Sequence, residues 1–154
     1  MPAVRSGRAG EAASLTALCL RSKAHWGYDT AFIEQSAAAL AVHEAEIAAG
    51  RVLVAVDAAG RALGVARVEP DGELGVMFVD PPAIGSGIGR ALFEGAVALA
   101  RGIGARRMAI LADPNAARFY ERMGARFVDN APSDAIPGRT LPLYEYDLTD
   151  KDAR

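Results

Sequence analysis

The sequence is most informative at Ile84-Gly85-Ser86-Gly87-Ile88-Gly89-Arg90, where three glycines stand at alternate positions. Alternating residues predict a β-strand at 74–79 just before this segment, and apolar residues spaced three or four apart predict an α-helix at 88–103 just after it. The segment is therefore expected to join a strand to a helix. Glycine has no Cβ, so consecutive N–H groups can converge there, and the helix dipole makes the position attractive to an anion.

The composition of this turn admits two interpretations: a phosphate-binding loop, or a turn whose glycines only let strand and helix pack closely. A dinucleotide fingerprint that begins at Gly85 needs glycine or alanine at position 90, where the chain has Arg90. A mononucleotide P-loop needs a Gly-Lys pair, which the sequence lacks. Ser86 has isoleucine two residues to either side, so it is not a nucleophile elbow. The expected ligand is a diphosphate of another class.

Outward from the turn, hydrophobic periodicity and turn residues predict an α/β (α+β) fold in the order β-α-α-β-β-β-α-β-α-β-β. We expect a twisted, mixed, mostly antiparallel sheet of about seven strands with helices on both faces. Asp71-Gly72 predicts a hairpin before the 74–79 strand, and the strand–turn–helix–strand order after it predicts a parallel crossover. The other expected elements are a strand near Val4, helices at 11–23 and 30–50, strands at 52–56, 63–68, 108–111, 125–128 and 143–148, and a short helix at 114–123.

Length and composition restrict the class of protein. The chain has 154 residues, 51% of them hydrophobic, which suits a single domain over 1–154. No apolar run approaches the length of a membrane span, and no apolar block follows the first ten residues, so neither a membrane partner nor a secretory signal is expected. The net charge of −2 argues against a nucleic-acid partner.

The cysteine and histidine content is equally restrictive. Cys19 is the one cysteine, cannot form an internal disulfide, and is expected to be a small buried residue of a helix. Beside it the chain has only His25 and His43, which gives no metal-ligand spacing, so no metal site is expected. One free cysteine suits a reducing compartment, so a cytoplasmic location is expected.

Two segments carry a family resemblance. Residues 79–92 resemble the acyl-CoA motif of the GCN5-related N-acetyltransferase (GNAT) family, in which Gln/Arg-x-x-Gly-x-Gly/Ala follows a Val-Asp-Pro strand end. Gly87 and Gly89 stand at the two glycine positions, whereas Ile84 at the Gln/Arg position is a departure that removes one side-chain contribution. Residues 113–125 resemble the family's Asn-x-x-Ala-x-x-Phe-Tyr-x-x-x-Gly-Phe motif, at a family-like distance from the first. The resemblance implies an acyl-CoA N-acyltransferase-like fold.

The resemblance further implies transfer of an acetyl group from acetyl-CoA to a primary amine of a small molecule, amino acid or peptide, by direct attack in a ternary complex and without a metal. Tyr120 is implied as the general acid. On the expected helix it is rotated from Phe119 and Met123, so its side chain is expected to face the cleft. The alternative is a tyrosine that only packs. Glu73 is the expected general base and Glu69 the other candidate; the alternative is that both are solvated turn residues. The alternative function is a non-catalytic acyl-CoA-binding sensor or scaffold.

Binding residues follow from the same resemblance. The end of the 74–79 strand is implied to bind the pantetheine amides. Gly75 is a candidate for a bulge at which this strand separates from the next. A free N–H near Phe78 is a candidate to polarise the thioester carbonyl. The loop 136–142 is expected to close the cleft or to form a homodimer contact, and Arg139 is a candidate partner for an acidic acceptor. The expected cofactor-binding residues are Met77, Phe78, Val79, Ile84, Gly85, Ser86, Gly87, Ile88, Gly89, Arg90, Asn115 and Phe119. The expected acceptor-binding residues are His25, Trp26 and Tyr28. Each role has an alternative. The 74–79 strand could pair as an ordinary sheet strand, Asn115 could form hydrogen bonds at a helix N-terminus, and Trp26 could pack at the edge of the core.

Overall fold

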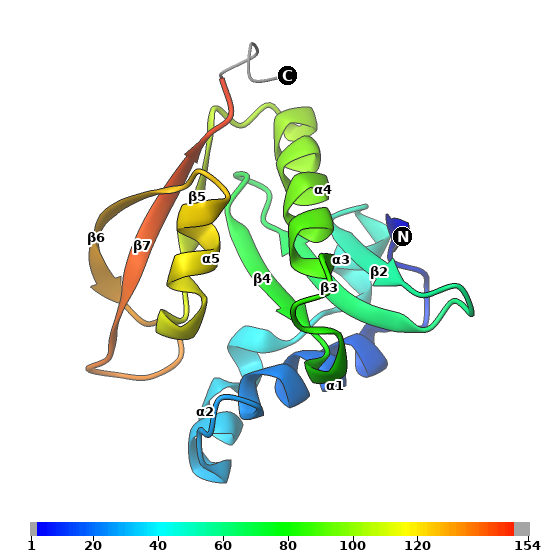
Figure 1. The fold of residues 1–154 in the computed structure, drawn as a ribbon, viewed down its shortest axis with the longest axis horizontal. Coiled ribbons are helices and arrows are strands. Elements are labelled where there is room, and N and C mark those ends of the chain that lie inside the picture. The colour runs from blue at the N-terminus through cyan, green and yellow to red at the C-terminus, as the bar shows by residue number, and fades with distance from the viewer. Residues whose placement is uncertain (1–2, 150–154) are drawn as a thin grey trace.

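One mixed sheet runs through the computed structural model, which describes residues 3–149 (Figure 1). Within those residues the sheet has seven strands in the order β1-β2-β3-β4-β5-β7-β6. The strands are β1 (Ala3–Ser6), β2 (Val52–Val56), β3 (Ala62–Val68), β4 (Leu74–Val79), β5 (Arg107–Leu111), β6 (Arg126–Pro132) and β7 (Thr140–Asp147). The helices are α1 (Ala12–Ala24), α2 (Thr30–Leu40), α3 (Glu44–Ala48), α4 (Ile88–Ile103) and α5 (Ala117–Arg122), with short 3₁₀ turns η1 (Pro81–Ala83) and η2 (Pro114–Ala116).

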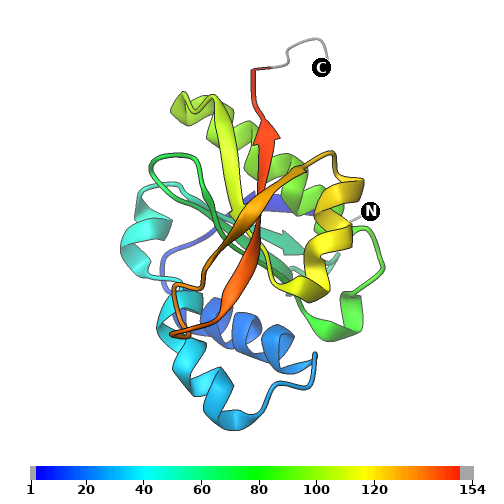
Figure 2. The ribbon, with the colours of Figure 1, turned by 90° about the vertical axis from the view of Figure 1, so that its left-hand side faces the viewer.

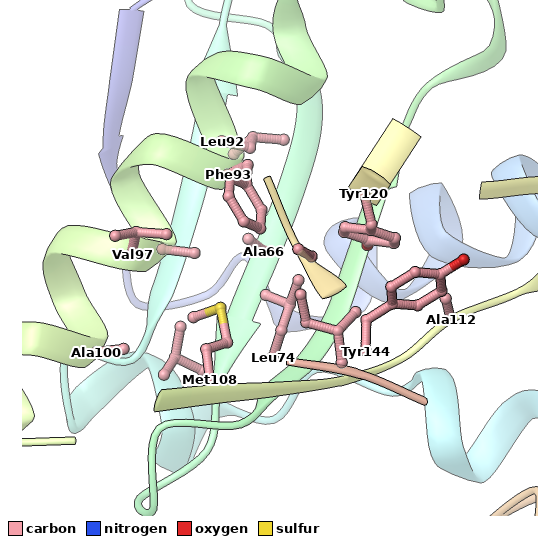
Figure 3. Close-up of a cluster of buried hydrophobic side chains, with 14 of the residues drawn as sticks. Ala66, Leu74, Leu92, Phe93, Val97, Ala100, Met108, Ala112, Tyr120 and Tyr144 are labelled. Atoms are coloured by element: carbon pink, nitrogen blue, oxygen red, sulfur yellow. The ribbon is translucent and has the colours of Figure 1, made fainter. Parts of the chain in front are cut away.

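The predicted fold class is confirmed, because helices cover both faces of a mostly antiparallel sheet (Figure 2). On one face α4 packs the apolar stripe that its spacing predicts, and its buried side chains meet those of the sheet and of α5 (Figure 3). On the other face α1 packs Leu15, Leu18 and Cys19 against the sheet. Burial of each large aliphatic side chain contributes about 1.5–3 kcal/mol to these two cores. Cys19 is fully buried, as predicted, and burial raises the pKa of its thiol to about 12.

Two element boundaries differ from prediction. The expected helix at 30–50 is two helices, because the chain is extended near Val42, whose side chain is buried and whose N–H donates to the Thr16 hydroxyl at 2.9 Å. The last two strands are longer than expected, because β6 and β7 pair along a long hairpin as far as Pro132 and Thr140. No helix among residues 3–149 has the length and apolarity to cross a membrane, and no group of three or more His, Cys, Asp or Glu residues in that range has a metal-binding arrangement.

The sheet opens between its two parallel strands. β4 and β5 pair at Leu74 and Ile110 only, and beyond that point they diverge (Figure 1). β4 has a bulge next to this point: Arg67 of β3 pairs with Val76 and Val68 pairs with Leu74, so Gly75 is the extra residue. This confirms the predicted bulge. A Cβ at position 75 would lie within 3.0 Å of the far ends of the Glu69 and Arg67 side chains, so a larger residue there would displace both.

Candidate active site

The glycine turn lies between η1 and α4. Gly85 and Gly87 have φ angles of 87° and 88°, a left-handed conformation that residues with side chains rarely adopt. A Cβ at either position would meet no atom within 4 Å, so the space above the turn is open. A Cβ at Gly89 would instead lie 3.2 Å from Cε1 of Phe119. The conformational need for glycine therefore applies to Gly85 and Gly87, and the packing need applies to Gly89.

The backbone donors of this turn are available to a ligand. The Ser86 N–H donates to the Ala83 carbonyl and the Ala91 N–H to the Gly87 carbonyl, both at 3.2 Å. Within the described part of the chain, the N–H groups of residues 87–90 have no acceptor. They stand at the positive end of a 16-residue helix. The exposed Arg90 side chain lies nearby, and its Nη1 is 3.7 Å from Oε2 of Glu94. This set of donors fits the two phosphate groups of a coenzyme A diphosphate in charge and in number.

A cavity of about 1130 Å³ connects the turn with the rest of the expected site. It runs past Met77, Phe78 and Val79 of β4 and reaches Tyr120 and Glu73. Its lining includes residues of α4 and α5 on one face of the sheet and of α1 and α2 on the other. The cavity therefore passes through the opening between β4 and β5, so that two ligands can meet there from opposite faces.

The cavity lining includes Ile84, Gly85, Gly87, Gly89, Arg90, Asn115 and Phe119, but two residues of the expected cofactor set lie outside it. The Ile88 side chain is buried in the core, with 2% exposure, so only its backbone N–H faces the turn. The Ser86 hydroxyl donates to the Ala83 carbonyl and so stabilises the turn itself. Both side chains thus shape the turn from within, and neither lines the cavity.

The expected acceptor residues are divided. Trp26 lines the cavity with 44% of its surface exposed, so it does not plug the core edge. The His25 ring packs edge-on against the Trp26 ring, with 5.0 Å between their centroids, and is not part of the cavity lining. Tyr28 is also outside the lining, and its ring stacks on the Phe32 ring with 4.3 Å between their centroids. Trp26 is therefore the member of this set that a ligand in the cavity would touch.

Tyr120 combines a buried ring with an unpartnered hydroxyl. Its side chain is 5% exposed and its ring packs against Phe93 and Phe119. Phe119 and Met123 are partly buried and also pack against this core. Among residues 3–149 the hydroxyl has no hydrogen-bond partner, and no fully enclosed side-chain oxygen there lacks one. The hydroxyl therefore opens into the cavity that Tyr120 lines. Burial, helped by the negative charge of Asp113, raises the pKa of this phenol.

Glu73 is a carboxylate of the cavity lining that has no charged partner in the described part of the chain. It is half-buried directly before β4, and within the described residues it has no ion-pair partner. Burial raises the pKa of its carboxyl, and the charges of Asp71, Asp134 and Glu69 raise it further. Glu69 is held by Arg67 at 2.7 Å, so its charge is already compensated.

These features agree with a comparison against protein families. Residues 10–134, most of the chain, match the model of the acetyltransferase (GNAT) domain. The chain belongs to the GNAT family. No curated protein matches it, but solved structures share its GNAT fold.

Three of these structures show the range of similarity. The chain is 25% identical to a GCN5-related N-acetyltransferase from Rhodopseudomonas palustris, with a TM-score of 0.77 and 96% of each chain covered. It is 23% identical to yncA from Salmonella typhimurium, solved with its cofactor acetyl-CoA, with a TM-score of 0.68 and coverage of 96% of this chain and 94% of that one. It is 16% identical to the PaiA N-acetyltransferase from Thermoplasma acidophilum in complex with coenzyme A, with a TM-score of 0.74 and coverage of 96% and 99%. The last two show the GNAT fold alone.

One cluster in this GNAT member is absent from the sequence predictions. Lys23, on α1, places its Nζ 2.5 Å from Oδ2 of Asp113, just beyond β5, and both side chains are largely buried. The Tyr28 hydroxyl donates to the same carboxylate at 3.0 Å, and Arg139 donates to the Tyr28 hydroxyl at 3.0 Å. Burial opposes ionisation of Asp113, but the bonds from Lys23 and from the Asn115 N–H lower its pKa overall. The cluster ties the α1–α2 connection to the far side of the opening.

The second GNAT motif contains the signal that could have found this cluster. Counted back from Tyr120, the asparagine position of that motif falls on Asp113 rather than on Asn115. The Asn115 amide donates to Asp113 at 2.9 Å and to the Tyr28 hydroxyl at 3.3 Å, so it is engaged by the cluster. A carboxylate in place of an amide at this buried position calls for a cation, which Lys23 provides.

Proposed function

We propose that the protein transfers the acetyl group of acetyl-CoA to a primary amine of a small molecule, amino acid or peptide, by direct attack in a ternary complex. The observation that supports this most is the cavity that joins the glycine turn to Tyr120 and Glu73 through the opening of the sheet. Acetyl-CoA and coenzyme A in the related structures support the same co-substrate. We further propose one catalytic domain over 1–154 that acts in the cytoplasm.

The backbone is suited to hold the co-substrate at two places. The free N–H groups of residues 87–90 bind the diphosphate. Along β4, the Asp80 N–H donates to Leu63 of β3 at 2.8 Å, and successive residues of a strand point their backbone groups to opposite sides. The N–H groups of Met77 and Val79 therefore point to the open side, where they bind the pantetheine arm or the thioester oxygen. The N–H of Phe78 points to β3, so Phe78 is a poorer candidate for polarising the carbonyl.

The chemistry then needs one base and one acid. The amine nitrogen forms a bond to the thioester carbonyl carbon, the C–S bond breaks, the Glu73 carboxylate takes the amine proton and the Tyr120 hydroxyl gives its proton to the departing thiolate. The raised pKa of Glu73 makes its carboxylate a better base, and the raised pKa of Tyr120 keeps it protonated. Cys19 is fully buried and its raised pKa keeps it a thiol, which supports direct attack over an acetyl-cysteine intermediate.

Calorimetric titration with acetyl-CoA, followed by a thiol-release assay over a panel of amines, tests this proposal. The expected result is binding of acetyl-CoA together with amine-dependent thiol release. Binding without release for any amine would contradict the proposal and support an acyl-CoA-binding sensor or scaffold.

A further inference from the structure

The part of the cavity that faces α1, α2 and the β3–β4 hairpin carries uncompensated negative charge. Asp71 and Glu73 of the hairpin and Asp134 of the β6–β7 loop line it, and together we call them the acidic rim. Among residues 3–149, no lysine, arginine or histidine forms an ion pair with any of the three. Lys23 is paired with Asp113 and Arg67 with Glu46 and Glu69. Arg122, which lines the cavity without an ion-pair partner among the described residues, lies on α5 on the other face of the sheet.

The three carboxylates of the acidic rim are close enough to act on one another. Burial raises the pKa of Glu73, and the charges of Asp71 on the hairpin and Asp134 on the β6–β7 loop raise it further, against the opposing charge of Arg67. Arg139, which also lines the cavity, places its guanidinium over the rings of Phe32 and Tyr28, at 4.9 and 5.4 Å. The rim therefore presents a negative potential into the cavity.

Two buried hydroxyls give independent evidence of a ligand in the same part of the cavity. Ser22 of α1 and Ser36 of α2 line it and are 4% and 3% exposed. Neither side chain has a hydrogen-bond partner among the described residues, and every fully enclosed side-chain oxygen there has one, so both hydroxyls open into the cavity. Both hydroxyls are therefore available to bond a polar ligand in the cavity. A hydroxyl oxygen accepts hydrogen bonds from an ammonium group.

We propose that the acceptor is an aliphatic diamine or polyamine, in which a second ammonium group binds the acidic rim while the reacting amine approaches the thioester. This inference rests on the proposed function, since it assigns the acceptor of that same site. A monoamine would leave the rim uncompensated, and an acceptor with a carboxylate would be repelled by it. The uncharged walls of Trp26, Ala39 and Leu40 suit the methylene chain between the two nitrogens.

Equilibrium binding to the coenzyme A-saturated protein at low salt tests the inference without turnover. The probes are 1,4-diaminobutane, 1-aminobutane and 4-aminobutanoate, which share a four-carbon chain and differ in the group at its far end. We expect the diamine to bind about tenfold more tightly than the monoamine, the amino acid to bind most weakly, and the preference to fade with added salt. Equal binding of diamine and monoamine would overturn the inference.

Variants assign the preference to the rim. The double substitution Asp71→Asn/Asp134→Asn keeps the side-chain shapes, including the acceptor that Asp71 offers to the Glu73 N–H, and is expected to remove most of the diamine preference. Asp129→Asn, on the exposed strand β6 and outside the cavity lining, is the matched control and is expected to keep it. A preference that survives the double substitution would contradict the assignment.

Thiol release separates this inference from the proposed function. Equal turnover of monoamine and diamine would contradict the acceptor class and leave the acetyltransferase standing. A diamine preference in binding that disappears in Asp71→Asn/Asp134→Asn, with no thiol release for any amine, would uphold the charge recognition and contradict the proposed transfer.

Discussion

Two tyrosines of the same core cluster differ in what their hydroxyls contact (Figure 3). The Tyr144 hydroxyl donates to Glu121 at 2.5 Å, and this bond raises the pKa of Tyr144 to about 12. Tyr120 has an equally buried ring, but its hydroxyl opens into the cavity without a partner. The same substitution at the two positions therefore separates the loss of a catalytic proton from the loss of a core hydroxyl.

Tyr120→Phe is expected to lower kcat by about a hundredfold, because general acid catalysis contributes at least that factor, and to leave the affinity for acetyl-CoA nearly unchanged. Tyr144→Phe is the matched control. It is expected to retain kcat and to lower the free energy of unfolding by about 1 kcal/mol through the lost hydrogen bond. Steady-state kinetics and urea denaturation measure both effects. Equal loss of kcat in the two variants would reduce Tyr120 to a packing residue.

The pH dependence of kcat reports the same pair of groups. The pKa of Glu73 is raised above its usual 4.5, so its carboxylate is lost as the pH falls through that raised value, and kcat is expected to fall on the acid side. The pKa of Tyr120 is raised above its usual 10.0, so its proton is retained and no decline is expected below about pH 10. Glu73→Gln is expected to remove the acid limb. A decline of wild-type kcat centred below pH 9 would point to a different acid.

At the scale of elements, the connections between helix and strand carry the binding groups. The turn before α4 has two left-handed glycines and four N–H groups without an acceptor among the described residues. In β4, the bulge at Gly75 directly follows the residue that pairs with β5. The Lys23–Asp113 pair joins α1 to the end of β5 across the opening of the sheet. Each feature sets the position of the next element.

Gly87→Glu is expected to abolish coenzyme A binding, because its carboxylate would repel the phosphates at the turn. Gly60→Glu is the matched control, since Gly60 has a φ of 87° and equally open surroundings in the β2–β3 turn. Both variants are expected to lose about 1–2 kcal/mol of stability from the left-handed conformation. Calorimetric titration with coenzyme A distinguishes them, and unchanged affinity in Gly87→Glu would remove this turn from the binding site.

Lys23→Met is expected to lower the free energy of unfolding by about 3 kcal/mol at pH 7, because it leaves the buried Asp113 charge without its cation. Lys23→Met/Asp113→Asn is expected to recover part of that loss. Because the pKa of Asp113 is lowered below 3.8, the pair stabilises the fold above that value and is lost as the pH falls through the lowered pKa. Urea denaturation of wild type and both variants tests this. Additive losses in the double variant would mean that the two groups do not interact.

At the scale of the whole molecule, the sequence predicts features that depend on neighbouring residues and does not predict contacts between residues far apart in the chain. The bounds of α4 and β4 and the bulge at Gly75 come from patterns within a few residues, and the structure has them. The partnership of Lys23 with Asp113 spans 90 residues and leaves no local pattern. The sequence leaves the place of the Tyr120 ring open between cleft and core, because helix α5 is too short for its spacing to show which side meets the core.

The cavity through the sheet is also a property of the whole molecule, since it is lined by residues of α1, β4 and α5 together. We propose that free amides at the start of α4 hold the diphosphate of coenzyme A and so place its sulfur beside the Tyr120 hydroxyl. A crystal structure with bound coenzyme A measures both. We predict phosphate oxygens within hydrogen-bond distance of the N–H groups of residues 87–90 and the sulfur within hydrogen-bond reach of Tyr120. A diphosphate bound elsewhere, or a sulfur on the far side of β4 from Tyr120, would contradict the account.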